Sequence, residues 1–531
     1  MAKYGLGIDF GSLSARAVLI DVANGKCVAS GSHAYKNAVM ESLNGVPLGE
    51  GWALQNPADY LESMAFCVKK AVESAKISVE DIIGIGVDFT ACSILPIKND
   101  GTPLSFDERF INNPHAYVKM WKHHAAEPYA REITQLAIAR GEEFLKKFES
   151  ISSEWLIPKI MQIVCEAPEI YAEADKIIEA GDWIVMMLTG EDCRNSCAAG
   201  YKGQYDPNTG YMNKEFLKSL NPAIENVEEE KLGRVVPSGT YVGKLNKKYA
   251  EILGLKEGIS VASAIIDAHA AVPAVGICSP NEMLMIMGTS TCHMMLGNEE
   301  KCFKGLCGVV KDGIIPNFYG FEAGQCAVGD IFQWVIDEVV PKKYFDLAEQ
   351  NDINIYEYMS LLASQSEDES LVALDWWNGC RSPLMNSNLK GVISGFTMKT
   401  TVVDIFKTAV EATAFGTRRI IECFEQNGIA VNNLYACGGI AVKNSYIMQV
   451  YADVTGKKIS VSASDDAVAH GSAILGAVAA GKNNGGYDTV ADAVKNMACG
   501  YAGEYLPNKE KAELYNKKYQ KYLEMSEFFS K

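Results

Sequence analysis

No stretch of the 531-residue sequence is apolar for long enough to cross a membrane as a helix, and no signal-peptide core precedes the first predicted strand. Basic residues are fewer than acidic residues, so the formal net charge is −17 at pH 7. This charge argues against nonspecific binding to nucleic acid or to an anionic membrane, because both attract basic surfaces. An anionic ligand can still bind in a local pocket.

Cys-x-x-Cys pairs are absent, although the chain has 15 cysteines. A secreted protein of this size would risk mispairing so many scattered thiols, so we expect a reducing, cytoplasmic location. Cys193 and Cys197 are the closest pair, and no second ligand pair at zinc-site spacing follows them, so we expect reduced thiols. Residues 123–127 (HHAAE) lack the His-Glu-x-x-His pattern of a zinc site, and we expect them on the exposed face of a helix.

Hydrophobic residues make up 48% of the chain and charged residues 22%, a composition typical of a soluble globular enzyme. The length exceeds what one hydrophobic core usually supports, so we expect two large domains. Apolar strands that end in polar breaks, with helices between them, predict an α/β fold. We place the first domain at residues 1–277, with a polar, helical insertion around residues 106–236, and the second at residues 278–531. Residues 342–372 are predicted to be a further, peripheral insertion.

Polar residues follow apolar runs at two places where a site in an α/β fold would lie. The run at residues 259–266 predicts a buried strand, Asp267 ends it, and the small residues 268–276 predict a short helix. Residues 82–87 form a second predicted strand that ends in the polar break of residues 88–92. Ligands of open α/β sheets bind at the carboxyl ends of strands, so Asp267 is our candidate for the catalytic base of a kinase.

Two turns made of glycine and hydroxyl residues lie between predicted strands. Residues 11–14 read GSLS, and residues 287–291 read MGTST. The repeated layout indicates an internal duplication with one hairpin in each domain, although an ordinary β-turn is the alternative for each. Backbone N–H groups and hydroxyls in such turns can bind phosphates without bulky side chains in the way. Asp9, just before the first turn, is placed to hold Mg²⁺ directly or through water.

Three loops carry further candidate binding residues. Lys202 lies in a predicted loop flanked by glycines, where an exposed surface lysine is the alternative. Glu322 lies in a glycine-rich aromatic loop. Gly438 and Gly439 join a predicted strand to a helix at residues 445–455, and they allow a ligand such as adenosine to lie against the backbone.

Two later helices have distinctive compositions. Residues 401–426 predict a long helix with one inward apolar face. Residues 471–480 predict a helix of nearly all small residues. Small side chains allow a helix to pack close to a neighbour or a ligand.

Phosphoryl transfer requires a cradle for the phosphates, Mg²⁺, and a carboxylate that orients and deprotonates the attacking hydroxyl. The two hairpins, Asp9 and Asp267 match these parts, with ATP as the expected phosphate donor. A positioned base such as Asp267 usually accelerates a reaction ~10²–10⁴-fold. The sequence therefore predicts a kinase.

Four motifs in this order resemble those of the FGGY carbohydrate kinases. They are residues 7–16 (GIDFGSLSAR), 267–270 (DAHA), 287–291 (MGTST) and 437–439 (CGG). The resemblance extends from about residue 4 to at least residue 500. It implies two actin-like (ribonuclease H-like) domains with ATP and a sugar in the cleft between them.

Other segments resemble the branch of this family that acts on L-ribulose. Residues 88–92 (DFTAC) resemble this branch and differ from the GQMHG loop of xylulose kinases. Further segments that resemble this branch are residues 121–126, 152–155, 200–202 and 324–330. The resemblance implies that the ketopentose contacts Ala91, Lys202, Asp267 and Glu322. It implies that ATP lies near Gly11, Ser12, Thr289, Gly438, Gly439 and Asn444.

The implied reaction is transfer of the ATP γ-phosphate to the 5-hydroxyl of L-ribulose, a step of L-arabinose catabolism. Ser12 replaces a threonine found in many members, and Cys92 and Cys326 replace residues that are often threonine or serine in this branch. Two alternatives remain: a related kinase acting on D-ribulose, ribitol or xylulose, and an actin-like ATPase that needs no sugar. The sequence determines neither the stereochemistry of the sugar nor the oligomeric state, so a homodimer stays open.

Overall fold

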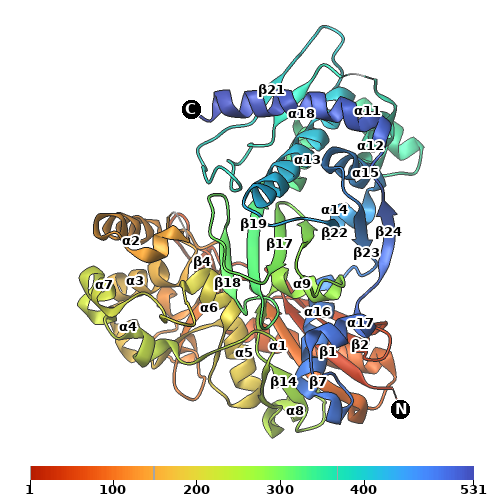
Figure 1. Ribbon diagram of the computed structural model, residues 1–531. Coiled ribbons are helices and arrows are strands. Elements are labelled where there is room, and N and C mark those ends of the chain that lie inside the picture. Colours follow the sequence, from red (N-terminus) through yellow and green to blue (C-terminus); the bar gives the residue numbers. More distant parts are fainter. Residues whose placement is uncertain (1, 148–149, 368) are drawn as a thin grey trace.

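The computed structural model describes residues 2–147, 150–367 and 369–531, and within these residues two seven-stranded sheets form the frame of the protein (Figure 1). Met1 and residues 148–149 of the predicted insertion lie outside the described residues, as does residue 368 of the segment 342–372. None of the described helices is long and apolar enough to pass through a bilayer. The predicted α/β fold is confirmed.

The first sheet comes from the N-terminal half of the chain, in the order β13-β14-β7-β1-β2-β3, with β15 also paired to β7. Its strands are β1 (Tyr4–Phe10), β2 (Ser14–Asp21), β3 (Cys27–Ala34), β7 (Ile82–Phe89), β13 (Tyr241–Lys244), β14 (Ser260–Ala262) and β15 (Ile265–Ile266). Strands β1, β2 and β3 form an antiparallel meander, and β7 runs parallel to both β1 and β14. All eight residues of β7 are buried, as expected for a central strand covered on both faces.

The second sheet has the order β18-β19-β17-β16-β22-β23-β24. Its strands are β16 (Glu282–Met287), β17 (Thr291–Gly297), β18 (Gly308–Lys311), β19 (Tyr319–Gln325), β22 (Asn433–Cys437), β23 (Ile459–Ser462) and β24 (Tyr501–Tyr505). Strands β16, β17 and β19 form an antiparallel meander, and β22 runs parallel to both β16 and β23. The order β19-β17-β16-β22-β23 repeats β3-β2-β1-β7-β14 of the first sheet, which supports the predicted internal duplication.

Helices surround both sheets. They are α1 (Pro57–Ala75), α2 (Glu127–Arg140), α3 (Leu156–Glu166), α4 (Pro168–Glu173), α5 (Ala180–Thr189), α6 (Ser196–Gly203), α7 (Lys214–Leu220), α8 (Lys247–Leu253), α9 (Asp267–Ala274), α10 (Gly329–Trp334), α11 (Lys342–Gln350), α12 (Ile355–Gln365), α13 (Val402–Gln426), α14 (Gly439–Lys443), α15 (Ser445–Thr455), α16 (Ala467–Ala480), α17 (Val490–Met497) and α18 (Lys509–Phe529). The long helix α13 and the helix α15 match their predicted ranges, because a capping box and an asparagine N-cap mark their starts in the sequence.

The predicted insertion forms a distinct body on one side of the first sheet (Figure 1). It contains helices α2, α3, α4 and α7 and two of the four strands, β9 and β10, of a small sheet of order β10-β8-β9-β6. The short strands outside the two large sheets are β4 (Ser42–Leu43), β5 (Val46–Pro47), β6 (Leu54–Gln55), β8 (Ile94–Ile97), β9 (Val118–Lys119), β10 (Lys176–Glu179), β11 (Arg194–Asn195), β12 (Val235–Val236), β20 (Val372–Leu374) and β21 (Val392–Ser394). Buried residues such as Ile133, Ile160 and Phe216 give the insertion its own hydrophobic core.

Helix α16 links the two halves of the chain. It follows the second sheet in sequence, but it packs on β1 and β7 of the first sheet and beside α9 (Figure 1). A Cβ atom on Gly7 or Gly86 would collide with a carbonyl oxygen of α16. A Cβ atom on Gly471 of α16 would collide with the carbonyl oxygen of Ala270 in α9. The predicted close packing of this small-residue helix is confirmed. The domain boundary between residues 277 and 278 stays a prediction. Helix α16 follows this boundary in the sequence and yet covers the first sheet.

The prediction that Lys202 lies in a loop is wrong. Helix α6 begins after Asn195, whose side chain caps it, and ends at Gln204, which has a φ of 58°. The glycines that suggested a loop serve packing instead, since a Cβ atom on Gly200 would collide with the side chain of Val310. A helix therefore holds the Lys202 side chain.

The strand predicted at residues 259–266 is interrupted. Strand β14 ends at Ala262 and β15 begins at Ile265. The backbone N–H of Ser263 donates to Thr240 O at 2.7 Å, directly before β13. Ser260 is equally polar and lies within β14, so the polarity of Ser263 alone did not mark this break in the sequence.

The prediction that residues 123–127 lie on the exposed face of a helix is wrong. Helix α2 begins only at Glu127, and His123 is fully buried before it. His123 Nε2 lies 2.8 Å from Gln162 Oε1, so a buried hydrogen bond satisfies the imidazole.

Candidate active site

An inner cavity of about 330 Å³ lies where the carboxyl ends of β7 and β15 approach the β16–β17 hairpin of the second sheet. All four residues predicted to contact a sugar line it, namely Ala91, Lys202, Asp267 and Glu322. Ser12 of the first predicted phosphate hairpin lines it as well. These residues are far apart in the sequence, so the fold is what brings them together.

Asp267 occupies the first position of α9, directly after β15. Its Oδ1 accepts a hydrogen bond from the backbone N–H of Ala268 at 2.6 Å. Burial raises the pKa of Asp267 to about 7, although that hydrogen bond and the charge of Lys202 oppose the shift. A carboxylate with a pKa near the working pH is well suited to accept a proton.

Two further aspartates lie beside Asp267 at the ends of neighbouring strands. Asp9 of β1 is paired in register with Asp88 of β7, which is paired in turn with Ile265 of β15. Burial raises the pKa of Asp9, and burial together with the charge of Asp9 raises the pKa of Asp88 well above its ordinary value. Ser472 Oγ donates to Asp88 Oδ2 at 2.6 Å, which opposes part of this rise. The pKa rises further for Asp88 than for Asp9, so Asp9 is the member of the pair that ionises more readily.

The environment of Asp9 fits a magnesium ion. Mg²⁺ usually takes one or two protein carboxylates and completes its shell with water and substrate phosphates. Asp9 offers hard carboxylate oxygens two residues before the first hairpin turn. Within the described residues, no group of three or more His, Cys, Asp or Glu side chains forms a complete metal cage. Asp9 lines neither the inner cavity nor the second cavity, so its role as the residue that would hold Mg²⁺ stays a prediction.

Glu322 of β19 and Lys202 of α6 form a buried ion pair on the wall of the inner cavity, with 3.6 Å between Oε2 and Nζ. Burial opposes ionisation of Glu322, but Lys202, His269 and Arg381 together outweigh it, and the pKa of Glu322 falls below its ordinary value. His269 Nε2 also lies 3.6 Å from Glu322 Oε2, but burial lowers the pKa of His269 to about 4, so its imidazole is neutral at pH 7. Glu322 Oε2 has no hydrogen-bond partner in the described part of the chain, which leaves it available to a ligand hydroxyl.

A buried lysine supports the loop that carries Ala91 from behind. Lys159 of α3 donates to Cys92 O at 2.6 Å and to Met120 O at 2.9 Å. Cys92 has a φ of 54°, a conformation that side-chain-bearing residues rarely adopt unless neighbouring contacts hold them there. Lys159 is therefore a positioning residue for this loop.

The turns of the two predicted phosphate hairpins are each closed by a glycine N–H, but they differ in length. Gly11 N donates to Ser14 O at 3.0 Å, and Gly288 N donates to Ser290 O at 2.9 Å. Gly11 lines neither of the neighbouring cavities and serves the turn itself. Ser290 lines the inner cavity, whereas Gly288 and Thr289 line a second cavity. The second hairpin therefore forms the wall between the two cavities.

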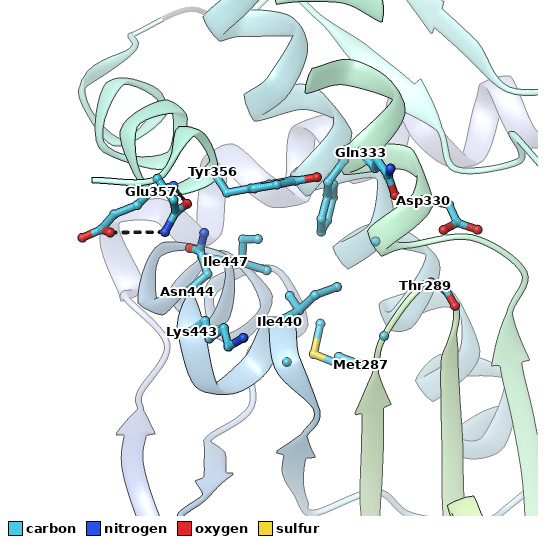
Figure 2. Close-up of a pocket in the computed structure, with 15 residues that line it drawn as sticks. Met287, Thr289, Asp330, Gln333, Tyr356, Glu357, Ile440, Lys443, Asn444 and Ile447 are labelled. Atoms are coloured by element: carbon cyan, nitrogen blue, oxygen red, sulfur yellow. Dashed lines mark hydrogen bonds between the residues drawn. The ribbon is translucent and has the colours of Figure 1, made fainter. Parts of the chain in front are cut away.

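This second cavity has a volume of about 460 Å³ (Figure 2). Figure 2 shows Tyr356 across the cavity from Met287 and Ile440, with polar groups such as Asn444 at its side. An apolar slot with a few polar groups is typical of a site for a small ligand or a cofactor. The slot suits a flat heterocyclic ring, with the attached phosphates extending toward the second hairpin.

Three of the residues predicted to contact ATP line the second cavity, namely Thr289, Gly439 and Asn444. Gly438 does not line it, but its φ of 94° and its close approach to Met287 O fix the turn that exposes Gly439. A Cβ atom on Gly439 would meet nothing within 4 Å, so the backbone there is open to a ligand.

The prediction that residues 342–372 form a peripheral insertion is wrong. This segment contains α11 and α12, and α12 supplies Tyr356 and Glu357 to the wall of the second cavity. Met359 and Ala363 of α12 are buried in the core of the second half.

Three side chains of the inner cavity were missed by the sequence analysis. Arg381 comes from the connection between β20 and β21, and nothing in its local sequence marks it. Trp121 donates its Nε1–H to Ser12 Oγ at 2.9 Å, a contact between segments that are distant in sequence. His269 lies two residues after Asp267, and this spacing on a helix N-terminus was a usable signal.

The chain matches two family models. Residues 4–274 match the N-terminal domain of the FGGY family of carbohydrate kinases, and residues 283–480 match the C-terminal domain of that family. Together the two matches cover most of the sequence. The protein therefore belongs to the FGGY family of carbohydrate kinases.

Curated relatives match over almost the whole chain. A ribulokinase from Bacillus licheniformis is 48% identical over 526 residues, which cover 98% of this chain and 95% of the relative. A ribulokinase from Anoxybacillus flavithermus is 45% identical over 536 residues, which cover 100% of this chain and 95% of the relative.

Solved structures of sugar kinases share the fold. A xylulose kinase from Rhodospirillum rubrum superposes with a TM-score of 0.81 at 19% identity and covers 100% of both chains. A glycerol kinase from Plasmodium falciparum, solved with ADP, has a TM-score of 0.78 at 18% identity and covers 99% of this chain and 98% of its own. The predicted fold of two actin-like halves is consistent with these neighbours.

Proposed function

We propose that the protein transfers the γ-phosphate of ATP to the 5-hydroxyl of L-ribulose, giving L-ribulose 5-phosphate and ADP in L-arabinose catabolism. The convergence of Asp267, Lys202 and Glu322 on one cavity beside the second hairpin carries this proposal. The naming of the two full-length relatives as ribulokinases supports L-ribulose as the sugar.

In this reaction Asp267 accepts the proton of the 5-hydroxyl while that oxygen bonds to the γ-phosphorus. The bond between the γ-phosphorus and the bridging oxygen breaks, and ADP leaves. Glu322 Oε2 accepts a hydrogen bond from a sugar hydroxyl, and Lys202 donates to a sugar oxygen. A buried polar pair of this kind rejects analogues that lack the matching groups, because the pair would remain unsatisfied.

ATP occupies the second cavity in this proposal, with adenosine against Gly439 and Asn444 and the phosphates along Gly288 and Thr289. Mg²⁺ held by Asp9 would neutralise charge on the phosphates. The backbone of the two hairpin turns, near Ser12 and Thr289, can approach the phosphates closely because both turns contain glycine.

The proposed partners are small molecules: the sugar, ATP and Mg²⁺. The net charge of −17 supports this choice over nucleic acid or an anionic membrane. All 15 cysteines are free thiols, which supports a reducing, cytoplasmic compartment. A homodimer stays compatible with the proposal.

The pH dependence should report the titration of Asp267. Because burial raises its pKa to about 7, Asp267 is protonated below that pH and ionised above it. The value of kcat/KM for the sugar should fall about tenfold per pH unit below that point, since only the ionised form accepts a proton. Initial rates between pH 5 and 9 test this, and a rate that stays level down to pH 5 would contradict it.

Replacing Lys159 with methionine should weaken sugar binding more than turnover. The variant loses the donor to Cys92 O and Met120 O, so the loop of Ala91 relaxes. A hydrogen bond to a charged group is worth about 1.5–3 kcal/mol, so we expect KM for the sugar to rise at least about tenfold. Steady-state kinetics would show this rise with kcat and the KM for ATP little changed. An unchanged KM for the sugar would remove Lys159 from its positioning role.

A panel of sugars tests the choice of substrate. ADP formation would be measured with L-ribulose, D-ribulose, D-xylulose, L-xylulose, ribitol and glycerol. We expect the highest kcat/KM for L-ribulose. A preference for another ketopentose or pentitol would retain Asp267 as the base and replace the proposed sugar.

A further inference from the structure

A third cavity, which we call the outer cavity, lies between the insertion and the second half of the chain and has a volume of about 710 Å³. Its wall comes from residues within 142–147, from the segment after α6 within 204–213, and from residues within 300–309. None of the residues assigned to phosphoryl transfer lines it. The outer cavity is therefore separate from the cleft that holds the sugar and ATP.

A buried glutamine on the wall of the outer cavity lacks partners. Gln204 is only 6% exposed, and neither its Oε1 nor its Nε2 has a hydrogen-bond partner in the described part of the chain. Buried side-chain amides are nearly always hydrogen-bonded, so this one points to a ligand that supplies both a donor and an acceptor. A hydroxyl group does both.

Among the described residues, four acidic side chains and one lysine line the outer cavity, which disfavours an anionic ligand. Lys147 Nζ lies 2.8 Å from an oxygen of Asp206 and 2.5 Å from one of Glu300, so it ties the insertion to the second half. Glu142 accepts hydrogen bonds from Arg140 and Asn213, each at 2.9 Å. Since these carboxylates already have partners, the cavity favours a neutral ligand over an ion.

Aromatic side chains complete the wall. Tyr205 and Tyr211 lie with ring centroids 5.1 Å apart and planes tilted by 59°, and Phe144 also lines the cavity. Aromatic surface together with a few fixed polar groups suits a small molecule that has both C–H faces and hydroxyls. The carboxylate oxygens nearby remain able to accept from hydroxyl donors.

We propose that the outer cavity binds a neutral, polyhydroxylated small molecule of about pentose size, as a site distinct from the one in which the sugar is phosphorylated. The free amide of Gln204 would exchange hydrogen bonds with its hydroxyls, and the tyrosines would contact its C–H faces.

Helix α6 connects the outer cavity to the inner one. Two residues of this segment line the outer cavity: Gly200 within the helix and Gln204 at its C-cap. Lys202, which lies between them, lines the inner cavity. The helix cannot shift freely, because Gly200 packs directly on Val310 of β18. A ligand that contacts Gly200 and Gln204 would act on the same helix that carries Lys202, so we expect its effect to fall on KM for the sugar.

The first test measures binding to the full-length protein without ATP, so that no turnover occurs. L-ribulose, L-arabinose and ribitol would be titrated by calorimetry into a Glu322→Ala variant, which weakens sugar binding in the inner cavity. We expect at least one of these probes to bind once per chain and to slow hydrogen exchange within residues 142–147 and 204–213. Failure of all three to bind, or protection confined to residues 265–270, would overturn the proposal.

Two variants localise the binding, and both are compared with the exposed control Gln350→Met. Gln204→Met removes the donor and the acceptor at similar size, and Thr209→Trp fills the cavity from its exposed rim. We expect both variants to lose the protection while kcat without probe stays at the wild-type value. Protection retained in both variants would overturn the proposal.

A kinetic measurement tests the coupling through α6. A saturating probe should shift KM for the phosphorylated sugar about fivefold or more in the wild type and in Gln350→Met, but not in Gln204→Met. An equal shift in Gln204→Met would show competition in the inner cavity and contradict the coupling. These tests do not depend on which sugar is phosphorylated, so their failure is distinguishable from failure of the proposed substrate.

Discussion

Asp267→Asn should lower kcat ~10²–10⁴-fold, the usual contribution of a positioned acid–base group. The amide keeps the shape of the side chain and can still accept from Ala268 N, but it cannot take a proton from the 5-hydroxyl. Sugar binding should change little, because Lys202 and Glu322 remain in place. Single-turnover rates with saturating ATP, together with a calorimetric Kd for the sugar, separate these two effects.

The matched control is Asp346→Asn, an exposed aspartate on α11 outside both cavities, which should leave kcat unchanged. The acidic limb of the pH profile should also disappear in Asp267→Asn, since the titrating group is gone. A kcat within tenfold of the wild type would exclude Asp267 as the base and leave Asp9 or Asp88 as the carboxylate to test.

Lys202→Met is the other variant with a large expected effect. It should weaken binding of the sugar and lower the folding stability of the protein. The variant leaves Glu322 buried without its cation, and breaking one side of a buried ion pair typically costs about 3–5 kcal/mol of folding stability. It also removes a charged hydrogen bond to the sugar worth about 1.5–3 kcal/mol, so KM for the sugar should rise about 10–150-fold. Chemical denaturation and steady-state kinetics measure the two effects independently.

The double variant Lys202→Met/Glu322→Gln separates the two effects. Removing the unpaired charge should restore much of the stability but none of the sugar affinity. Lys343→Met, an exposed substitution on α11, serves as the control for the loss of a lysine. A wild-type KM in the single variant would show that Lys202 does not contact the sugar.

The framework of the site was predictable from the sequence because its signals are local. An apolar run followed by Asp267, and a glycine-hydroxyl turn at residues 287–291, each lie within a few residues. The repeat of two hairpins correctly indicated two sheets of matching strand order. Asparagine and threonine caps likewise marked where α13 and α15 begin.

The rest depends on contacts between distant segments. Arg381 reaches the inner cavity from the connection between β20 and β21, and Lys159 of α3 supports the cavity wall from behind. Their local sequence gives no sign of this. Lys202 was assigned to a loop because glycines flank it, whereas Gly200 is required by the packing of Val310. A glycine in a sequence can indicate a flexible backbone or a place where another segment packs closely against the backbone. Only the residue that packs against the glycine distinguishes the two cases.

The fate of the γ-phosphate tests the central claim most directly. Phosphorus NMR would follow ATP, Mg²⁺ and the enzyme with and without L-ribulose. The account predicts a sugar phosphate monoester on carbon 5, formed together with ADP only when the sugar is present. Inorganic phosphate released at the same rate without sugar would contradict it, because the cleft would then be that of an ATPase.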